Sequence, residues 1–353
     1  MEFEFEALPW QIIFGNSALK RLPSELDKHG LSRALVLSTL EQRHHADIVA
    51  DLIEQRCAGI FDQAVMHVPI EIVSAAQVVA KSLDVDCTVS IGGGSTTGLG
   101  KALALKSDLP NIAIPTTYAG SEMTNVWGIT QDGRKTTGRD HKVLPTFTIY
   151  DPELTLQLPA FISGPSGINA MAQAVVNATS SRPNPIISAL ALDGIRALAT
   201  SLPTVVKQPN NLDARNQALY GACLCGAALG AGITSLHHRL CHTLGGSFNT
   251  SHADTHAILL AYSVEYNQAA VPGGTQRVAE ALGVKDAARG IFDLLHKVSD
   301  KTNLQQLGLK EGDLDKAAEI ATEKACKNAV EVTRDKVREL FFNAYHGNGP
   351  GGA

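Results

Sequence analysis

The sequence predicts two domains: an α/β domain over residues 1–157, with a mainly parallel sheet and a β-hairpin, and an all-α domain over residues 158–353. Strand and helix patterns alternate through the first part, which is typical of a parallel sheet with crossover helices. Beyond residues 151–159 only helical periodicity remains. With 353 residues, of which 44% are hydrophobic, the chain is long and apolar enough for two buried cores.

The first domain opens as repeated strand and helix units. Strands are predicted where short apolar runs are bounded by turn residues, and helices where apolar residues recur every three to four positions. The predicted strands are 11–14, 33–38, 61–65, 87–91, 111–114 and 146–150, and the predicted helices among them are 17–26, 46–54 and 70–83.

The sequence pattern changes after these strand and helix units. Asp132-Gly133 lies between the extended runs 125–130 and 135–139, and this dipeptide between two strands predicts a hairpin. The second domain is predicted to hold helices over the 160s–170s, 184–201, 211–229, 232–245 and 253–267, with three more before residue 345.

Composition excludes several classes of protein. A formal net charge of −5 without a long Lys/Arg run disfavours nucleic acid or an anionic membrane surface as a partner. Residues 1–6 are acidic, unlike a signal peptide, and no apolar run approaches the ~20 residues that span a membrane. None of the six cysteines forms C-x-x-C. We therefore expect a cytoplasmic protein with reduced core cysteines rather than a zinc or redox pair.

A glycine-rich turn follows the strand at 87–91. Gly92, Gly93 and Gly94 let the main chain approach an anion, and Ser95 is predicted to cap the next helix. The first N–H groups of that helix then face the phosphates of a ligand. The spacing matches neither G-x-G-x-x-G nor the P-loop, so a tight turn without a ligand is the alternative.

A second turn of the same kind follows the next strand. The segment Pro115-Thr-Thr-Tyr-Ala-Gly120 comes directly after the apolar run 111–114. Two such turns favour a phosphate-bearing ligand over an empty turn.

Histidines are dense in the second domain, where five of the twelve lie between residues 237 and 256. His238 and His242 are one helical turn apart and share a face. Gly245-Gly246 offers a helix end, after which a loop carrying His252 can fold back. A single histidine on an apolar helix is usually a hydrogen-bonded core residue, but convergence of three predicts a site.

The order of these motifs, over nearly the whole chain, resembles the iron-containing alcohol dehydrogenase superfamily. The motifs are 92–95, 115–123, Ser166-Gly-Ile-Asn-Ala-Met-Ala-Gln173 and the histidine block. Within the superfamily, residues 135–140 and 236–249 are most similar to the maleylacetate reductase branch. The resemblance implies a Rossmann-like first domain, the dehydroquinate synthase-like fold, and an active site in the cleft between the domains.

The resemblance also points to a departure. In metal-dependent members one helix supplies Asp and His at i and i+4, and a later block supplies two more histidines. The matching positions here are Asn169, Gln173, His238 and His252. Neutral amides are poor ligands for iron or zinc, and two histidines are too few for a tight site. We therefore predict no catalytic metal, and we expect Asn169 and Gln173 to bind substrate instead.

The chemistry implied by the resemblance is a conjugate reduction. NADH or NADPH gives a hydride to the C=C bond of maleylacetate, which yields 3-oxoadipate in the breakdown of aromatic compounds. Hydride addition at the β-carbon leaves an enolate, whose charge must be stabilised and whose α-carbon must be protonated. We expect His242, His238 and His252 to carry these duties, with His242 near the nicotinamide.

The substrate carries two carboxylates, which need placed cations in a net acidic protein. The candidates are Arg239, Arg139 and Lys142, and Lys142 is at least as well explained as a surface charge. Tyr118 is predicted to contact substrate or cofactor.

Cofactor choice has a partial signal. NAD-preferring relatives often carry an Asp that bonds the ribose 2′-OH, whereas the matching residue here is Thr39, so both NADH and NADPH should be accepted. The predicted cofactor-binding residues are Thr39, Gly92, Gly93, Gly94, Ser95, Thr96, Thr116, Thr117, Tyr118 and Ala119.

Other interpretations stay open. A metal-dependent alcohol or polyol dehydrogenase of the same fold would need other ligands, such as Glu122 or His256. A catalytically inactive nucleotide-binding protein and a dehydroquinate synthase-like lyase are the further alternatives. A homodimer is expected from the prevalence of two-fold symmetry, and residues 151–159 are a candidate hinge.

Overall fold

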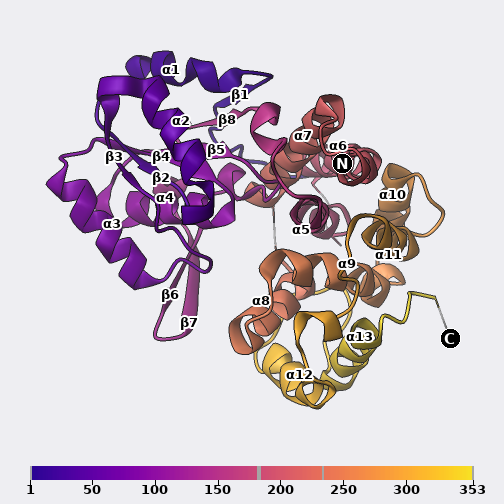
Figure 1. Cartoon of the computed structure of the whole chain (residues 1–353). Coiled ribbons are helices and arrows are strands. Elements are labelled where there is room, and N and C mark those ends of the chain that lie inside the picture. The colour runs from indigo at the N-terminus through magenta and orange to yellow at the C-terminus, as the bar shows by residue number, and fades with distance from the viewer. Residues whose placement is uncertain (1, 181–183, 233, 352–353) are drawn as a thin grey trace. The chain divides into compact units, whose positions relative to one another are not determined.

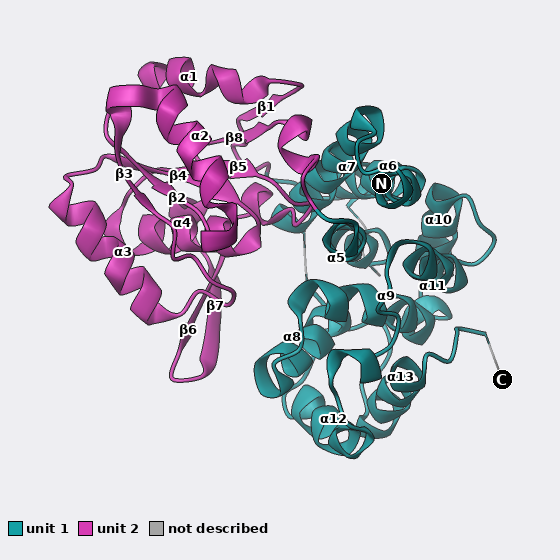
Figure 2. Cartoon of the chain, viewed as in Figure 1, with its two compact units in different colours: residues 1–6, 159–353 teal, residues 7–158 magenta. Residues whose placement is uncertain are grey.

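The computed structural model describes residues 2–180, 184–232 and 234–351, so residue 233 of the predicted helix 232–245 and the outermost residues of both predicted domains lie outside the described residues. The chain divides into two compact units, Ala7–Leu158 and Met1–Glu6 with Pro159–Ala353 (Figure 2). The first unit is α/β and the second is helical.

The N-terminal segment differs from the predicted domain limits, because it belongs to the helical unit and not to the α/β domain predicted for 1–157. Asn184 donates a side-chain hydrogen bond to the carbonyl of Glu4 at 2.9 Å, and Phe3 lines a groove with Ile186. These contacts join parts of the chain that are about 180 residues apart. The two units meet in the sequence between Leu158 and Pro159, and a hinge there stays a prediction.

The α/β unit is built on a parallel sheet (Figure 1), as predicted. Its central strands are mostly apolar and are buried along their whole length, which is what a parallel sheet covered by helices requires. The strand order is β1 (Ile12–Phe14), β8 (Phe147–Tyr150), β5 (Asn111–Pro115), β4 (Cys87–Gly92), β2 (Ala34–Leu37) and β3 (Cys57–Phe61). The helices of this unit are α1 (Leu22–Lys28), α2 (Arg43–Ile53), α3 (Ile70–Ser82) and α4 (Gly94–Ser107).

Two hydrophobic cores lie on opposite faces of this sheet. Along β2, Ala34 and Val36 join a core with residues of α1 and α2, whereas Leu35 and Leu37 join a core with residues of α3 and α4. Successive side chains of a strand point to opposite faces, so one buried strand feeds both cores. The unit is therefore doubly wound, with helices on both faces.

Two local predictions in this unit are wrong. The strand predicted at 61–65 is β3, Cys57–Phe61, because its parallel register with β2 ends where Leu37 pairs with Phe61. The helix predicted at 17–26 begins as a 3₁₀ turn, Ala18–Arg21, and becomes α1 only at Leu22. Pro23 sits in the first turn of α1, where its missing N–H costs nothing.

The predicted hairpin is confirmed. Strands β6 (Val126–Gln131) and β7 (Arg134–Arg139) pair antiparallel, with Gln131 opposite Arg134. Asp132 and Gly133, with φ of 50° and 70°, are the central residues of the turn between them. Positive φ at both central residues is the type I′ geometry that suits the twist of two paired strands.

The second unit is helical, as predicted, but in its described part four α-helices rather than three follow the one predicted at 253–267. α5 is its central helix, because nearly all of its residues from Ser163 onward are buried. The helices are α5 (Ala160–Ala178), α6 (Pro185–Lys207), α7 (Leu212–Gly230), α8 (Leu236–Phe248), α9 (His252–Gln268), α10 (Pro272–Leu282), α11 (Ala287–Val298), α12 (Leu314–Thr322) and α13 (Arg334–His346).

Helix α6 is the one described helix long and apolar enough to cross a membrane. It packs against α5 and α7, and 44% of its most apolar window is buried inside the protein. A core helix has the same properties.

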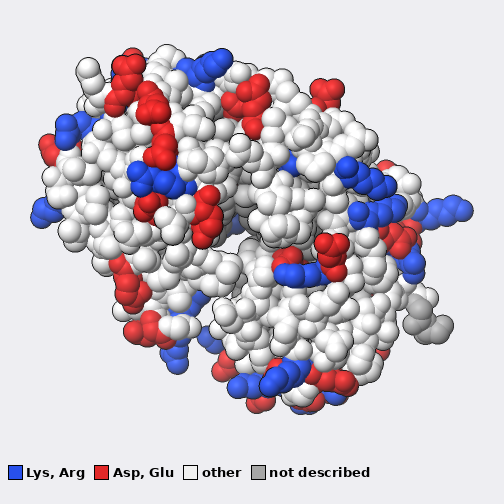
Figure 3. All heavy atoms as spheres, in the orientation of Figure 1, with Lys and Arg blue, Asp and Glu red and all other residues white. Residues whose placement is uncertain are grey.

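Charged side chains of both signs are interspersed on the visible face of each unit (Figure 3). This distribution agrees with the formal net charge of −5 and with the absence of a long basic run in the sequence.

Candidate functional site

The glycine-rich turn connects β4 to α4 in the α/β unit. Gly92 has φ of +151°, and a Cβ added there would lie 2.5 Å from Thr96 Oγ1, so only glycine fits. The prediction that Ser95 caps the helix is wrong, because α4 starts at Gly94 and Gly93 is the N-cap. No side chain caps the first turn, so its N–H groups remain available to an anion.

The two predicted turns lie next to each other. β4 and β5 are neighbours, with Gly92 opposite Pro115, and the N–H of Thr116 donates to the carbonyl of Gly92 at 3.0 Å. A Cβ at Gly93 would touch Thr117, with 3.0 Å to its Cγ2, and one at Gly94 would lie 3.8 Å from the Cβ of Ala119. The structure thus brings together the predicted cofactor residues of both turns. Tyr118, in the second turn, is fully buried.

The turns lie at the reversal point of the sheet. The chain runs from β2 outward to β3, and then crosses back to place β4 on the other side of β2. Ligands of open α/β sheets bind at the carboxyl ends of the strands where the order reverses. Two buried hydroxyls here, Ser38 Oγ and Thr96 Oγ1, have no partner among the described residues. The two adjacent turns and these unpartnered hydroxyls fit the phosphates and sugar groups of a dinucleotide.

Sequence reasoning missed Gln42. It lies in a 3₁₀ turn, Leu40–Gln42, after β2, and its Nε2 donates to Thr116 Oγ1 at 2.8 Å. Its Oε1 would be 2.9 Å from a Cβ at Gly92. Gln42 therefore ties the end of β2 to both turns, and only the strand order reveals this.

A carboxylate also lies near the predicted ribose position. Glu41 is two residues after Thr39, and its pKa is lowered by its own backbone N–H and by the Thr39 hydroxyl. This acid was not part of the prediction that both NADH and NADPH should be accepted. It is able to oppose a 2′-phosphate in the way that an Asp at position 39 would.

Glu122, which the sequence offered as an alternative metal ligand, is already hydrogen-bonded inside the α/β unit. It is buried and accepts a hydrogen bond from the Tyr150 hydroxyl at 2.7 Å. Burial raises its pKa. Beside it, the buried amino group of Lys101 donates to the carbonyls of Thr124 and Val126 at 2.8 and 2.9 Å, which anchors the segment before the hairpin.

The three candidate cations have different settings. Lys142 forms a 2.5 Å ion pair with Asp108 between exposed side chains, as a surface charge would. Arg139, also in the α/β unit, donates to Asn125 Oδ1 at 3.0 Å. Arg239, in α8 of the helical unit, points its guanidinium at backbone carbonyls of residues 324 and 325, at 3.3 and 3.4 Å.

The predicted histidines gather in the helical unit. α8 carries His238 and His242, whose ring centroids are 6.4 Å apart, and His242 stacks on His252 at 6.4 Å. His256 joins them, with its centroid 4.4 Å from that of His252 and 5.5 Å from that of His238. His242 is exposed, whereas His238 and His256 are buried.

The path of the chain between these histidines differs from the prediction. α8 does not end at Gly245-Gly246 but continues to Phe248, and Asn249, with φ of 54°, ends it in the left-handed conformation. His252 is then the first residue of α9 rather than part of a loop. Asn tolerates this conformation better than most residues, so it replaced glycine as the helix terminator.

The predicted substrate amides, Asn169 and Gln173, are buried one turn apart on α5. His238 donates through Nε2 to Gln173 Oε1. The other ring nitrogen, His238 Nδ1, and Asn169 Oδ1 are buried without a partner among the described residues. The structure therefore brings Gln173 onto the histidine cluster.

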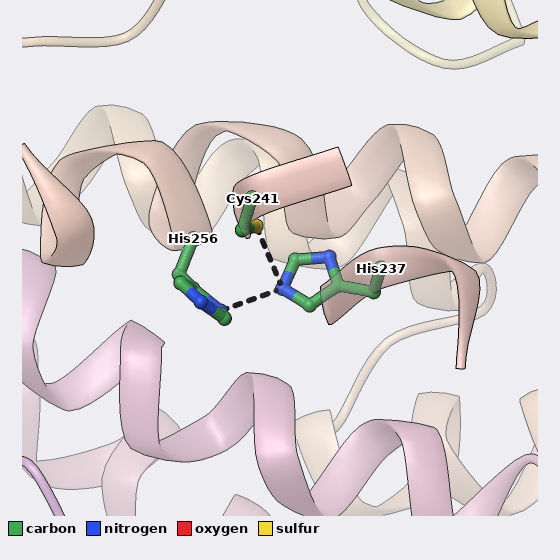
Figure 4. Close-up of side chains that lie close together, drawn as sticks. All are labelled: His237, Cys241 and His256. Carbon is green, nitrogen blue, oxygen red and sulfur yellow. Dashed lines mark hydrogen bonds between the residues drawn. The ribbon is translucent and has the colours of Figure 1, made fainter. Parts of the chain in front are cut away.

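These positions do not fit a catalytic iron or zinc ion. Two of the four side chains are neutral amides, and the Nε2 of His238 is held by one of them. Carboxylates and free imidazoles are the usual ligands of such ions. In the described part of the chain, the group with metal-ligand spacing is instead His237, Cys241 and His256, whose ligand atoms lie within 4.8 Å of one another (Figure 4).

That second group is a hydrogen-bonded cluster that sequence reasoning did not foresee. His237 Nε2 lies 3.0 Å from His256 Nδ1 and 3.7 Å from Cys241 Sγ, and its Nδ1 lies 3.0 Å from Ser263 Oγ. Burial, followed by the neighbouring histidines, lowers the pKa of His237 to about 3. Burial also lowers the pKa of His256 well below its usual value, so both rings are neutral at physiological pH.

A sheet with two anion-binding turns at its reversal point, and a separate helical unit with clustered histidines, define a nucleotide-dependent dehydrogenase with hydride and proton chemistry. The sequence of residues 9–152 matches the family model for iron-containing alcohol dehydrogenases, and residues 164–345 match the model for the C-terminal part of the same family. This chain belongs to the iron-containing alcohol dehydrogenase family.

Its similar relatives are more specific. The maleylacetate reductases of Sphingobium indicum and Burkholderia cepacia are 46% and 48% identical to it, over 99% of both chains in each case. Among solved structures, the maleylacetate reductase from Agrobacterium tumefaciens has a TM-score of 0.95 at 43% identity, covering 99% of this chain and 100% of that one. The chain therefore falls within the maleylacetate reductase branch of the family.

Proposed function

We propose that this oxidoreductase uses NADH or NADPH to reduce the conjugated C=C bond of maleylacetate to 3-oxoadipate, a step in the breakdown of aromatic compounds. The observation that carries this proposal is the buried histidine cluster with Gln173, in place of a metal ligand, bonded to His238. The chain that holds it is 40% to 48% identical to maleylacetate reductases over nearly its full length.

The α/β unit binds the cofactor, which supplies the hydride when bound. The uncapped first turn of α4 and the glycines before it would hold the pyrophosphate. Gln42 and Thr116 fix the two turns against each other, and by family resemblance Thr117 and Tyr118 would lie toward the nicotinamide side. Thr39 and Glu41 meet the adenosine ribose, so NADH is favoured over NADPH to the extent that Glu41 repels a 2′-phosphate.

The helical unit stabilises the negative charge of the enolate and supplies the proton for the α-carbon. Hydride addition at the β-carbon converts the ketone into an enolate, so negative charge develops on the ketone oxygen. An N–H from His242 or His252 hydrogen-bonds that oxygen and stabilises it. A proton then passes from a protonated histidine ring to the α-carbon, which restores the ketone, and the neutral ring takes up a new proton from solvent. His242 is exposed and stacked on His252, so these two rings are the accessible ones.

We propose that the reaction needs no catalytic metal. What supports this is the donor chemistry, since amides stand at two of the four positions and Gln173 occupies the Nε2 of His238. Asn169 and Gln173 then hydrogen-bond the substrate. Arg139 and Arg239 remain candidates for its carboxylates, and the Asp108 pair leaves Lys142 a surface role.

The experiment follows oxidation of NADH, and separately NADPH, with maleylacetate after exhaustive chelation, beside a panel of simple aldehydes. We expect turnover of maleylacetate that survives the chelator. Activity on aldehydes alone, and only with added iron or zinc, would instead establish a metal-dependent alcohol dehydrogenase.

We further propose a homodimer located in the cytoplasm. Closed two-fold assemblies are the commonest among soluble enzymes, which supports the dimer. Light scattering coupled to size exclusion measures the mass directly, and a mass near 37.4 kDa would show a monomer. Cell fractionation of the native host checks the location, and enzyme in the membrane or periplasmic fraction would contradict it.

A further inference from the structure

We propose that Ser263, His237 and His256 form a positioning chain that turns a hydrogen-bond acceptor of His256 toward His252 and so aligns His252 for proton transfer. This role rests on the proposed reductase function. The polarity of this hydrogen-bond chain, meaning which nitrogen of each ring carries the hydrogen, follows from the hydrogen bonds and from the neutrality of the buried rings, and it is tested separately.

The first link fixes the hydroxyl of Ser263. On α9 this hydroxyl donates to the carbonyl of Leu259, one turn earlier, at 2.8 Å. A hydroxyl has a single hydrogen to give, so toward His237 it acts as an acceptor. His237 Nδ1, at 3.0 Å, must therefore carry the hydrogen of that bond.

The second link fixes His237. Its ring is completely buried and neutral, since burial lowers its pKa to about 3. A neutral imidazole has one N–H, and here that N–H is at Nδ1. Its Nε2 therefore holds a lone pair and accepts. Both groups next to Nε2 are able to donate to it, namely His256 Nδ1 at 3.0 Å and the Cys241 thiol at 3.7 Å (Figure 4).

The third link fixes His256. Two bare ring nitrogens at 3.0 Å would repel each other, so Nδ1 of His256 carries the hydrogen. Because this ring is also neutral, its Nε2 is a pure acceptor. That atom is buried and has no partner among the described residues. A buried acceptor left open costs free energy, which indicates that a donor reaches it in the working enzyme.

The neighbours of His256 select the donor. His238 donates its Nε2–H to Gln173, and its Nδ1 carries no hydrogen, so this ring has no second N–H to donate to His256. His252, whose ring centroid is 4.4 Å from that of His256, is the nearer ring. With one N–H held by His256 Nε2, protonation of His252 places its second N–H toward the substrate as the proton to be transferred, much as an orienting acceptor directs the catalytic imidazole of a triad.

His237, Cys241 and His256 also have metal-ligand spacing, but hydrogen bonding explains their contacts better. The thiol of Cys241 is fully buried, and burial raises its pKa well above its usual value, so it stays protonated. A dication there would gain one thiolate at most, and its remaining charge would be buried without a partner.

The positions of the ring hydrogens of His237 and His256 are measured by ¹⁵N NMR of the whole protein, labelled with ¹⁵N-histidine, at neutral pH. The variants His237→Gln and His256→Gln assign the signals. We expect both rings in the Nδ1–H form, which is the less common form of free histidine. A His256 ring in the Nε2–H form, or a doubly protonated ring, overturns the chain. This result does not depend on any substrate.

The role is measured by kinetics with maleylacetate. His256→Leu should lower kcat about 10- to 100-fold, the range that a small misplacement of a reacting group costs, with KM changed less than about threefold. Ser263→Ala should lower kcat in the same direction, and Ser263→Thr should restore it, because the hydroxyl returns. A cavity of about 20 Å³ beside Ser263 and His237 gives room for the added methyl.

The matched control is His45→Leu in the α/β unit. His45 is also buried with an unpartnered ring nitrogen, but it lies on α2, far from this cluster in the sequence. This variant should leave kcat unchanged, because it alters a buried imidazole that is not part of the cluster. If His256→Leu keeps wild-type kcat, the positioning role is wrong. If the wild-type enzyme does not reduce maleylacetate while both rings are in the Nδ1–H form, the proposed function is wrong, but the direction of the hydrogen bonds between His237 and His256 stands.

Discussion

The two units of this protein build their sites by different means. In the α/β unit the site is backbone: glycines without a Cβ, an uncapped helix start and a strand register that aligns two turns. In the helical unit the site is side chains: buried imidazoles and amides from α5, α8 and α9 that hydrogen-bond one another. A backbone site is specified by local sequence, whereas a side-chain network depends on which helices meet.

This difference has a thermodynamic side. A glycine turn loses little when it stands empty, because its N–H groups reach water or a ligand. Buried imidazoles must be neutral and paired, or they cost free energy. We therefore expect changes in the helical unit to affect chemistry and acid stability, and changes in the α/β unit to affect cofactor binding.

The largest expected effect is on the accessible histidine. His242→Ala should lower kcat for maleylacetate by about 10²- to 10⁴-fold, as expected when an acid–base or polarising group is lost. Because the side chain is exposed, the melting temperature should change little. Steady-state kinetics with NADH and thermal melts measure both. A kcat within twofold of wild type would remove His242 from the mechanism.

The second effect concerns the amides. The double variant Asn169→Asp with Gln173→His restores a carboxylate and an imidazole on α5, beside His238. We expect it to bind zinc at least about 100-fold more tightly than the wild-type protein, because the ligands change from amides to a charged oxygen and a nitrogen. Isothermal titration with zinc compares the two proteins. Equal affinities would mean that the amides are not what keeps the metal out.

The third effect lies in the backbone site. Gly92→Ala forces a Cβ within 2.5 Å of Thr96 Oγ1 at a φ of +151°, and should weaken NADH binding by about 1–3 kcal/mol. Gly94→Ala, where the Cβ meets nothing nearer than 3.8 Å, should have a smaller effect. Fluorescence titration with NADH ranks the two. Equal losses would show that helix-start contacts rather than the Gly92 conformation set the affinity.

The smallest effect is on acid stability. Burial holds the pKa of His45 at about 4 and that of His237 at about 3, both below the ordinary 6.5. Below pH 6.5 the unfolded chain takes up protons that the folded chain refuses, so stability falls as pH drops from 6.5 toward these values. We expect the melting temperature to fall by several °C between pH 7 and pH 5.

The same pH series separates the units. His238 and His256 have lowered pKa values as well, so the helical unit should lose more stability than the α/β unit. Hydrogen exchange followed by mass spectrometry at pH 7 and pH 5 reports each unit. Faster acid exchange in the α/β unit would contradict the comparison.

The sequence by itself determined the features that local chemistry controls. Alternating strand and helix patterns gave a parallel sheet, because buried strands need apolar residues on both faces. Asp132-Gly133 gave the hairpin, since few other dipeptides accept positive φ twice. The glycine turn was readable because a missing Cβ has its effect within a few residues. The spacing of His238 and His242 placed both on one helix face.

Tertiary structure decided the rest, because it depends on partners distant in the sequence. Gln42 became part of the cofactor turns only through the strand order, and residues 2–6 joined the helical unit only through contacts with α6. Ser95 lost its capping role because the helix starts two residues early, with Gly93 as its N-cap. His256 became central because α8 and α9 pack against each other, so that a hydrogen bond to His237, which is itself bonded to Ser263, directs its ring. A sequence shows which imidazoles are available, but burial and hydrogen-bond direction decide which nitrogen holds the proton, and both arise only when the helices meet.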